Sequence, residues 1–229
     1  MNKKVVFICS FALLFLLVSC GADSIEYEGS KRVTASGKLV TSTGAALNDV
    51  EVELNVVEQY NEDVLNKVQS RNDGTFLANF PIPQENQNVQ FYATFEKEGY
   101  VTKAIYNTSL DDIEDLKYDL ETVNLYRIDE TVEVRMFFAA AAANRFLISY
   151  EIIPDAAADF EFANIPDPDR IDWSQYDGLI NSTERVLLKN SNITIKTEVE
   201  VEVNGQRTIE LNTVVVNAGA ASGAINILF

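Results

Sequence analysis

The chain has 229 residues, with 18 basic and 35 acidic side chains, no histidine and two cysteines. Its formal net charge of −17 disfavours binding to nucleic acid or to anionic lipid surfaces. Without histidine there is no Ser-His-Asp triad, no Cys-His pair and no histidine-ligated zinc or haem, and the sequence singles out no carboxylate pair. We therefore expect a protein without enzymatic activity, cofactor or metal.

The N-terminus has the pattern of an export signal. Lys3 and Lys4 precede the apolar run 5–18, and the small residue Ser19 comes directly before Cys20. This run is too short to cross a bilayer core, which needs about 20 apolar residues. We predict a cleaved signal peptide over residues 1–19 and a polar tether over residues 20–31.

The segment Leu17-Val18-Ser19-Cys20 resembles the lipobox of bacterial lipoproteins. The resemblance implies that Cys20 is acylated and becomes the new N-terminus. Two or three acyl chains would hold the protein firmly on a membrane, because each buried CH₂ contributes about 0.8 kcal/mol. Gly21 stands where Asp is the usual inner-membrane retention cue, so the resemblance favours the outer membrane. Since Cys9 leaves with the signal, we expect no disulfide.

Strand periodicity begins after the tether. Residues 50–56 and 89–96 alternate apolar with polar side chains, and turn signals such as Asn72-Asp73-Gly74 separate such runs. Short strands with turns about every ten residues predict an antiparallel β-sandwich. The longer, more polar segment 59–67 is expected to form a projecting surface loop.

A series of short motifs over residues 32–107 occurs in a characteristic order: Gly37-Lys38-Leu39-Val40, Gly44 with Leu47, the strand 50–54, Asn72-Asp73-Gly74-Thr75-Phe76 and Gly99-Tyr100. In this order they resemble carboxypeptidase regulatory-like domains. That resemblance implies a transthyretin-like, seven-stranded β-sandwich, which serves as an accessory module and supplies no catalytic residue. Independently, Gly74 suits a tight turn with positive φ, and Phe76 is expected to start a buried strand.

Residues 108–131 are predicted to form a connector or the final strand of the first domain. The acidic run 111–115 is expected to be solvated, with calcium binding as the alternative, although the spacing of a calcium loop is missing. Residues 132–229 are predicted to form a second antiparallel β domain of undefined type. The expected fold class is thus all-β, with a transthyretin-like sandwich followed by this second domain.

Residues 154–181 form the longest stretch without strand periodicity. It contains aromatic and acidic side chains that suit contact with a sugar, and the candidates are Asp169, Asp172, Trp173 and Tyr176. The simpler interpretation is that the rings fix the loop to the core. Calcium binding by residues 167–172 is a further alternative, although Pro168 and the missing glycine do not fit it.

Residues 193–203 and 209–215 alternate around Asn204-Gly205, which predicts a hairpin. A plain two-residue turn would set Val199 opposite Glu210 and so place an apolar face against a polar one. We therefore predict an odd loop or a bulge that pairs Val201 with Ile209 and Val199 with Leu211, all four of them buried.

Two functions follow as hypotheses. The first is a lipid-anchored accessory or scaffold protein of the outer membrane that docks to a cell-envelope protein complex. The alternative is a surface glycan-binding lipoprotein that uses the aromatic and acidic loop around residues 160–177. Partners would be the membrane, through the lipid, and a protein complex or a glycan, but not nucleic acid.

Overall fold

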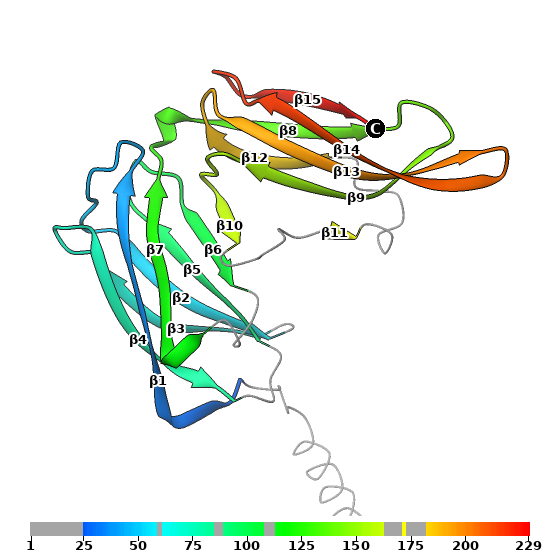
Figure 1. The fold of residues 1–229 in the computed structure, drawn as a ribbon. Helices are drawn as coiled ribbons and strands as arrows, with labels where there is room; N and C mark the ends of the chain where they lie inside the picture. Colours follow the sequence, from blue (N-terminus) through cyan, green and yellow to red (C-terminus); the bar gives the residue numbers. More distant parts are fainter. Residues whose placement is uncertain (1–24, 59–60, 85–88, 108–112, 163–170, 173–181) are drawn as a thin grey trace, which may run out of the picture.

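The computed structural model describes residues 25–58, 61–84, 89–107, 113–162, 171–172 and 182–229. These residues form β-strands in four sheets, with two short 3₁₀ turns, η2 (Glu114–Leu116) and η3 (Ile128–Glu130). Figure 1 shows the strands gathered in two lobes. The predicted all-β class is confirmed. Within the described ranges, no helix has the length and apolar character needed to cross a membrane.

The first lobe is a sandwich of seven strands. Its two sheets have the orders β4-β1-β7 and β6-β5-β2-β3, and the second sheet is extended next to β6 by a fifth strand, β10 (Phe160–Phe162), which comes from later in the chain. The strands are β1 (Tyr27–Thr41), β2 (Glu51–Glu58), β3 (Asn61–Gln69), β4 (Thr75–Pro83), β5 (Gln90–Glu96), β6 (Lys103–Asn107) and β7 (Lys117–Leu125). β7 pairs in parallel with β1, so the segment 108–131 supplies a strand to this lobe.

The core of the first lobe follows from the predicted alternation. Val52, Leu54 and Val56 point inward from β2, and their partners on β5 are Phe95, Ala93 and Phe91. The polar residues between them face outward, because successive side chains of a strand point to opposite faces. One apolar face on each sheet therefore provides the core.

Two boundaries differ from those predicted. β1 begins at Tyr27, inside the expected tether, because Tyr27 pairs with Pro83, packs against the core and donates a hydrogen bond from its hydroxyl to Asp63 at 2.6 Å. The expected surface loop 59–67 is wrong for its described part, since β3 pairs with β2 over Glu58 to Glu51. Alternation on β3 is obscured by a bulge, where the register shifts between Leu54 and Asn55.

The turn around Gly74 has the predicted geometry. Gly74 has a φ of +80°, and Phe76, two residues later, is buried in the core. A Cβ on Gly74 would lie 2.4 Å from the carbonyl oxygen of Leu39. The close approach lets Leu39 donate its N–H to the Gly74 carbonyl at 2.9 Å, so the turn is fixed directly onto β1.

The second lobe contains another seven strands and a separate core. Its sheets have the orders β12-β8-β15 and β14-β13-β9-β11. The strands are β8 (Thr131–Ala139), β9 (Arg145–Pro154), β11 (Ile171–Asp172), β12 (Ser182–Leu188), β13 (Asn192–Val203), β14 (Gln206–Asn217) and β15 (Gly223–Leu228). The domain that the sequence left undefined is therefore also a sandwich.

The second lobe repeats the topology of the first. The order β4-β1-β7 corresponds to β12-β8-β15, with the first strand of each lobe antiparallel to one neighbour and parallel to the last strand. The order β6-β5-β2-β3 corresponds to β14-β13-β9-β11, and every pair in both is antiparallel. In this correspondence β14 is the counterpart of β6.

The β13–β14 hairpin corrects the predicted register. Val199 pairs with Glu210, and Val201 pairs with Thr208, as a plain two-residue turn requires. Asn204 and Gly205 have φ values of 53° and 75°, which are those of a type I′ turn. Val199 and Val201 are buried as predicted, but Ile209 and Leu211 are exposed. The turn set the register because β14 is an edge strand and nothing in the described residues covers the face that carries Ile209 and Leu211. Burial therefore did not select between the two registers.

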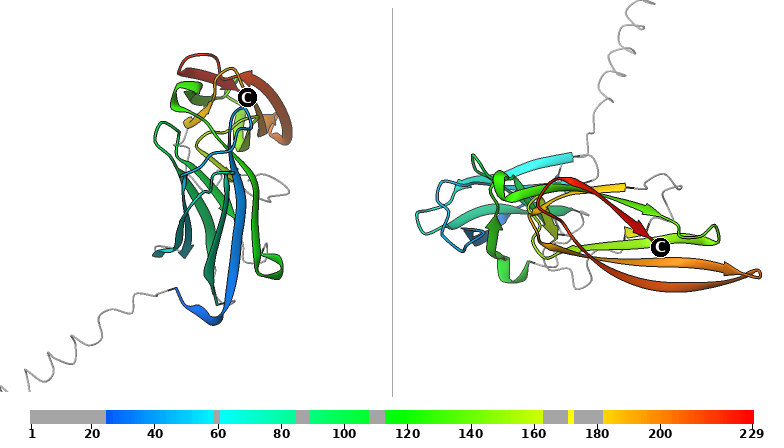
Figure 2. Two further views of the ribbon diagram at one scale, coloured as in Figure 1. Left: turned by 90° about the vertical axis from the view of Figure 1, so that its left-hand side faces the viewer. Right: turned by 90° about the horizontal axis from the view of Figure 1, so that it is seen from above.

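The lobes meet end to end with a bend between them. β1 enters the first lobe at the end far from the second lobe, and β7 leads back toward the second lobe (Figures 1 and 2). The β13–β14 hairpin extends away from the first lobe in Figure 1 and in the right-hand view of Figure 2 (orange).

Candidate functional site

The predicted ligand loop is not assembled within the described residues. Asp169, Trp173 and Tyr176 lie outside them, as does the lipidation candidate Cys20. Asp172 belongs to β11, where its backbone pairs with Ser149. Of the run 111–115, residues 111 and 112 are likewise outside. In the part of the chain that the structure describes, no three acidic or cysteine side chains are grouped to hold a metal ion.

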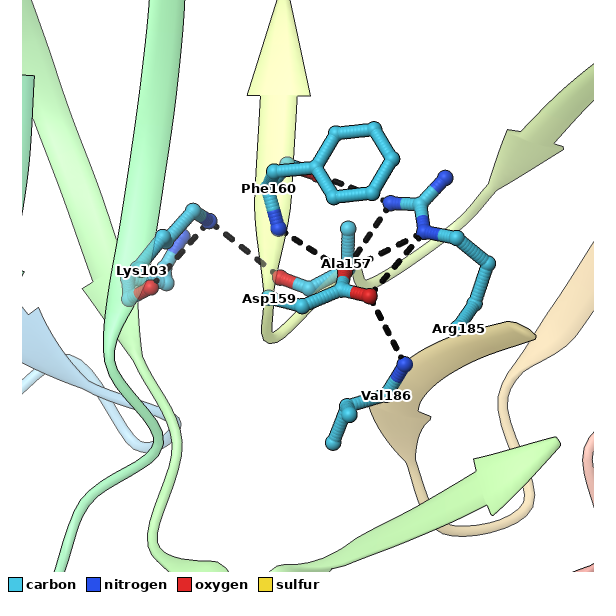
Figure 3. A network of polar contacts seen from close by, with 7 residues as sticks. Lys103, Ala157, Asp159, Phe160, Arg185 and Val186 are labelled. Atoms are coloured by element: carbon cyan, nitrogen blue, oxygen red, sulfur yellow. Dashed lines mark hydrogen bonds and ion pairs between the residues drawn. The ribbon is translucent and has the colours of Figure 1, made fainter. Parts of the chain in front are cut away.

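A buried polar network joins the two lobes (Figure 3). Its centre is the carboxylate of Asp159, which lies between β9 and β10 (Phe160–Phe162). Arg185 of β12 donates to this carboxylate from Nε at 3.2 Å and from Nη2 at 3.0 Å. The backbone N–H groups of Phe160 and Val186 donate to it as well, each at 2.8 Å. Each oxygen of the Asp159 carboxylate therefore accepts at least two hydrogen bonds, as burial of a charge requires.

Arg185 is also held on its other side. Its Nη2 donates to the carbonyl oxygen of Phe160 at 2.8 Å, and its guanidinium lies 3.8 Å from the centroid of the Phe160 ring. Guanidinium and aromatic ring attract through the ring quadrupole. The segment that leaves the second lobe is thus clamped to β12 by charge, hydrogen bonds and ring contact together.

Lys103 extends the network into the first lobe. Its side chain is 1% exposed, and Nζ donates to the carbonyl oxygens of Ala157 at 3.2 Å and Asn124 at 3.3 Å. Asn124 belongs to β7 of the first lobe, whereas Ala157 belongs to the segment that leaves the second. A single ammonium group therefore bridges backbone from both lobes.

The same segment adds a strand to the first lobe. β10 pairs in parallel with β6, which sets Phe160 beside Ala104 and Phe162 beside Tyr106. The N–H of Ala104 donates to the carbonyl oxygen of Asp159 at 2.8 Å. β10 thereby covers the edge of the first lobe that β6 would otherwise leave open, and it links the lobes through backbone hydrogen bonds.

Aromatic side chains form a row on the outer face of the sheet that β10 extends. Tyr92 stacks on Tyr106 with ring centroids 5.2 Å apart, and Phe160 meets Tyr106 edge to face at 6.3 Å. The hydroxyl of Tyr92 donates to Glu62, and burial together with this hydrogen bond raises the pKa of Tyr92. Beside Tyr92 lies Asn55, which is 1% exposed and whose side-chain amide has no hydrogen-bond partner among the described residues.

An acidic depression lies elsewhere on the first lobe. It is wide and open, with a polar lining: Asp49, Glu51, Gln69, Glu96, Lys97, Glu98 and Thr102. The ammonium group of Lys97 is held by the loop between β1 and β2, since Nζ donates to the carbonyl oxygen of Asn48 at 2.7 Å. Nothing in this depression pairs a nucleophile with a base.

Sequence reasoning missed the junction residues, although a signal was present. Lys103 lies two residues before the buried Ile105, and Arg185 lies two residues before the buried Leu187. Each charge therefore occupies the inward face of its strand, where an apolar side chain is expected. A charge in the apolar half of an alternating strand predicts a buried partner, but the sequence does not say which one.

Comparison with known proteins gives no family. No family model matches the chain, and no curated protein matches it in sequence. Among solved structures, 3-chlorocatechol 1,2-dioxygenase from Rhodococcus opacus 1CP is 12% identical with a TM-score of 0.33, over 45% of this chain and 64% of that one.

Two pilins are similar over more of the chain. The shaft pilin SpaA from Lactobacillus rhamnosus GG is 9% identical with a TM-score of 0.32, over 86% of this chain and 98% of that one. The major pilin subunit BcpA of Bacillus cereus is 12% identical with a TM-score of 0.28, over 82% and 69%. Similarities this weak say nothing about what the present chain binds.

Proposed function

We propose that the protein is a lipid-anchored, non-enzymatic accessory protein of the outer membrane that presents its second lobe, in a fixed orientation, to a cell-envelope protein complex. The observation that carries this proposal is the buried junction of Lys103, Asp159 and Arg185 with the β10–β6 pairing. A flexible linker between two lobes needs no buried charged groups. Here buried, hydrogen-bonded charges hold one lobe against the other, which supports a fixed orientation.

The direction of the chain supports an anchored spacer. Tyr27 starts β1 at the end of the first lobe that is far from the second lobe (Figure 1). Cys20 precedes Tyr27 by a few residues, so a lipid on Cys20 would attach the far end of the first lobe to the membrane. The second lobe and its projecting hairpin would then point away from the lipid surface.

The anchor is tested by replacing Cys20 with alanine. We expect the Cys20→Ala protein to leave the membrane fraction as a soluble or uncleaved product, because acyl chains supply the attachment. Cell fractionation and the mass of the mature N-terminus measure this. A correctly cleaved Cys20→Ala protein that stays on the membrane would show that something other than lipid holds it.

The accessory role is tested by comparing assemblies that contain the anchored protein. Native gel electrophoresis of membranes should place the wild-type chain in a complex larger than the chain itself, and Arg185→Met should reduce that association while leaving lipidation intact. Arg135→Met, which breaks an exposed ion pair with Glu184 on the same pair of strands, is the matched control. If both variants associate with the complex equally well, the junction between the lobes is not needed for the accessory role.

A glycan-binding role is the second candidate, and the row of Tyr92, Tyr106 and Phe160 favours it. Stacked rings beside amide and carboxylate groups suit the apolar face and the hydroxyls of a sugar. We expect Tyr106→Ala to weaken binding of a recognised polysaccharide about tenfold or more, which corresponds to a loss of about 1.4 kcal/mol. Calorimetry against cell-surface polysaccharides measures the affinity, with Leu77→Ala, an exposed position on the other sheet of the first lobe, as the control. Equal affinity of the two variants would show that the aromatic row does not bind the polysaccharide.

A further inference from the structure

β14 leaves a long edge open. In the first lobe the equivalent edge, on β6, is covered by β10. In the second lobe β14 is the last strand of its sheet, and none of the strands that the structure describes pairs with its outer side. β14 has 12 residues and contains neither proline nor lysine, two of the residues with which edge strands prevent further pairing, and its charged residues are Arg207 and Glu210.

The unpaired backbone groups of β14 can be assigned from the turn. Val203 and Gln206 flank the two-residue turn and exchange hydrogen bonds with each other. Alternate residues from Gln206 therefore face β13, and the residues between them direct their N–H and C=O groups to the open side. Ile209, Leu211 and Val215 belong to this outward set.

The same residues expose apolar side chains. Leu211 is 81% exposed, Val215 is 62% exposed and Ile209 is 51% exposed. Their side chains share the outer face of the sheet, because they pair with Glu198, Thr194 and Glu200 of β13. Open hydrogen-bonding groups and exposed apolar side chains thus coincide on one strand, which is what strand addition uses.

We propose that β14 pairs in antiparallel fashion with β14 of a second copy of this chain, so that one sheet continues through two second lobes. Around a two-fold axis at Asn212, Ile209 would face Val215 of the other copy, and Leu211 would face Thr213. Each of these residues presents open backbone groups, so the pairing satisfies them on both sides. The joint would bring the exposed apolar side chains of the two copies into lateral contact on the outer face of the continuous sheet.

Charge favours this register and a second copy as the occupant. On the inner face Glu210 would face Val214, and on the outer face Arg207 would face Asn217, so no like charges are opposed on β14. One row across the joint would run from Glu198 through Leu211 and Thr213 to Lys196 of the other copy. Acyl anchors, if the proposed function holds, would also confine copies to one membrane and raise their effective concentration.

The test is disulfide crosslinking of the full-length chain in membranes. Two tagged copies are co-expressed, one with Leu211→Cys and one with Thr213→Cys, because facing residues of an antiparallel pair lie within the Cα separation that a disulfide needs. We expect mild oxidation to give the mixed dimer at least about tenfold above the yield for copies with Val64→Cys, a position on the edge strand β3 that is 53% exposed, close to the 51% of Ile209. The same should hold for Ile209→Cys with Val215→Cys.

Further measurements separate the possible failures. The wild-type chain should give no crosslink, because acylation occupies the thiol of Cys20. A crosslink in the wild-type chain would mean that Cys20 is unacylated, and the anchor proposal would fail. The β14 cysteine pairs could still be compared with Val64→Cys in that case. Leu211→Lys should abolish the dimer measured by light scattering without changing the thermal midpoint, since the side chain is exposed. Mixed dimers no more abundant than those of Val64→Cys, or β14 cysteines that crosslink to a different protein, would overturn the proposal.

Discussion

Replacing Arg185 with methionine is expected to destabilise the protein by about 3 to 5 kcal/mol and to loosen the two lobes from each other. The substitution leaves the Asp159 carboxylate with the backbone N–H groups of Phe160 and Val186 but without its cation. Asp159 would remain largely buried, and an unpaired buried charge costs far more than the pair itself contributes. Urea unfolding of the purified protein measures the free energy of unfolding.

The matched control is Arg135→Met. Arg135 contacts Glu184 at 3.0 Å, but both side chains are well exposed, so the change should cost less than about 1 kcal/mol. Small-angle scattering adds a second measurement, because loss of the junction should broaden the distribution of lobe orientations in the Arg185→Met protein alone. Equal stability of the two variants, with unchanged scattering, would show that the junction does not fix the lobes.

Replacing Gly74 with alanine is expected to destabilise the first lobe by about 3 kcal/mol, which lowers the thermal midpoint by roughly 10 °C. The added Cβ would lie 2.4 Å from the carbonyl oxygen of Leu39, and the φ of +80° is itself unfavourable for alanine. Relief requires the turn to move away from β1, which breaks the hydrogen bond from Leu39 to Gly74.

Gly44 provides the control for this second prediction. Its φ of +83° is nearly the same, but a Cβ there would meet no atom within 4 Å. Gly44→Ala should therefore show the backbone strain alone, about 1 to 2 kcal/mol. Differential scanning calorimetry compares the two variants directly. If both lower the midpoint equally, the contact with Leu39 is not what requires glycine at position 74.

The sequence determined the all-β class because alternation of apolar and polar side chains is a local signal. Val52, Leu54 and Val56 could be placed in a core, and Gly74 in a turn of positive φ, from their neighbours in the chain alone. The Asn204-Gly205 turn was equally legible, and its local geometry outweighed the burial argument that we set against it. The predicted hairpin register was wrong because we assumed that the face of β14 carrying Ile209 and Leu211 is covered by another sheet.

The tertiary structure decided what lies next to what. Three features depend on pairings between distant segments. β14 is an edge strand, β7 and β15 return in parallel to β1 and β8, and β10 crosses to the other lobe. Lys103 and Arg185 could be recognised as misplaced charges, but Asp159, the partner of Arg185, and Ala157, an acceptor for Lys103, are found only in three dimensions. The physical reason is that periodicity records which face of a strand is buried, whereas edges and buried charge partners are set by the packing of the whole chain.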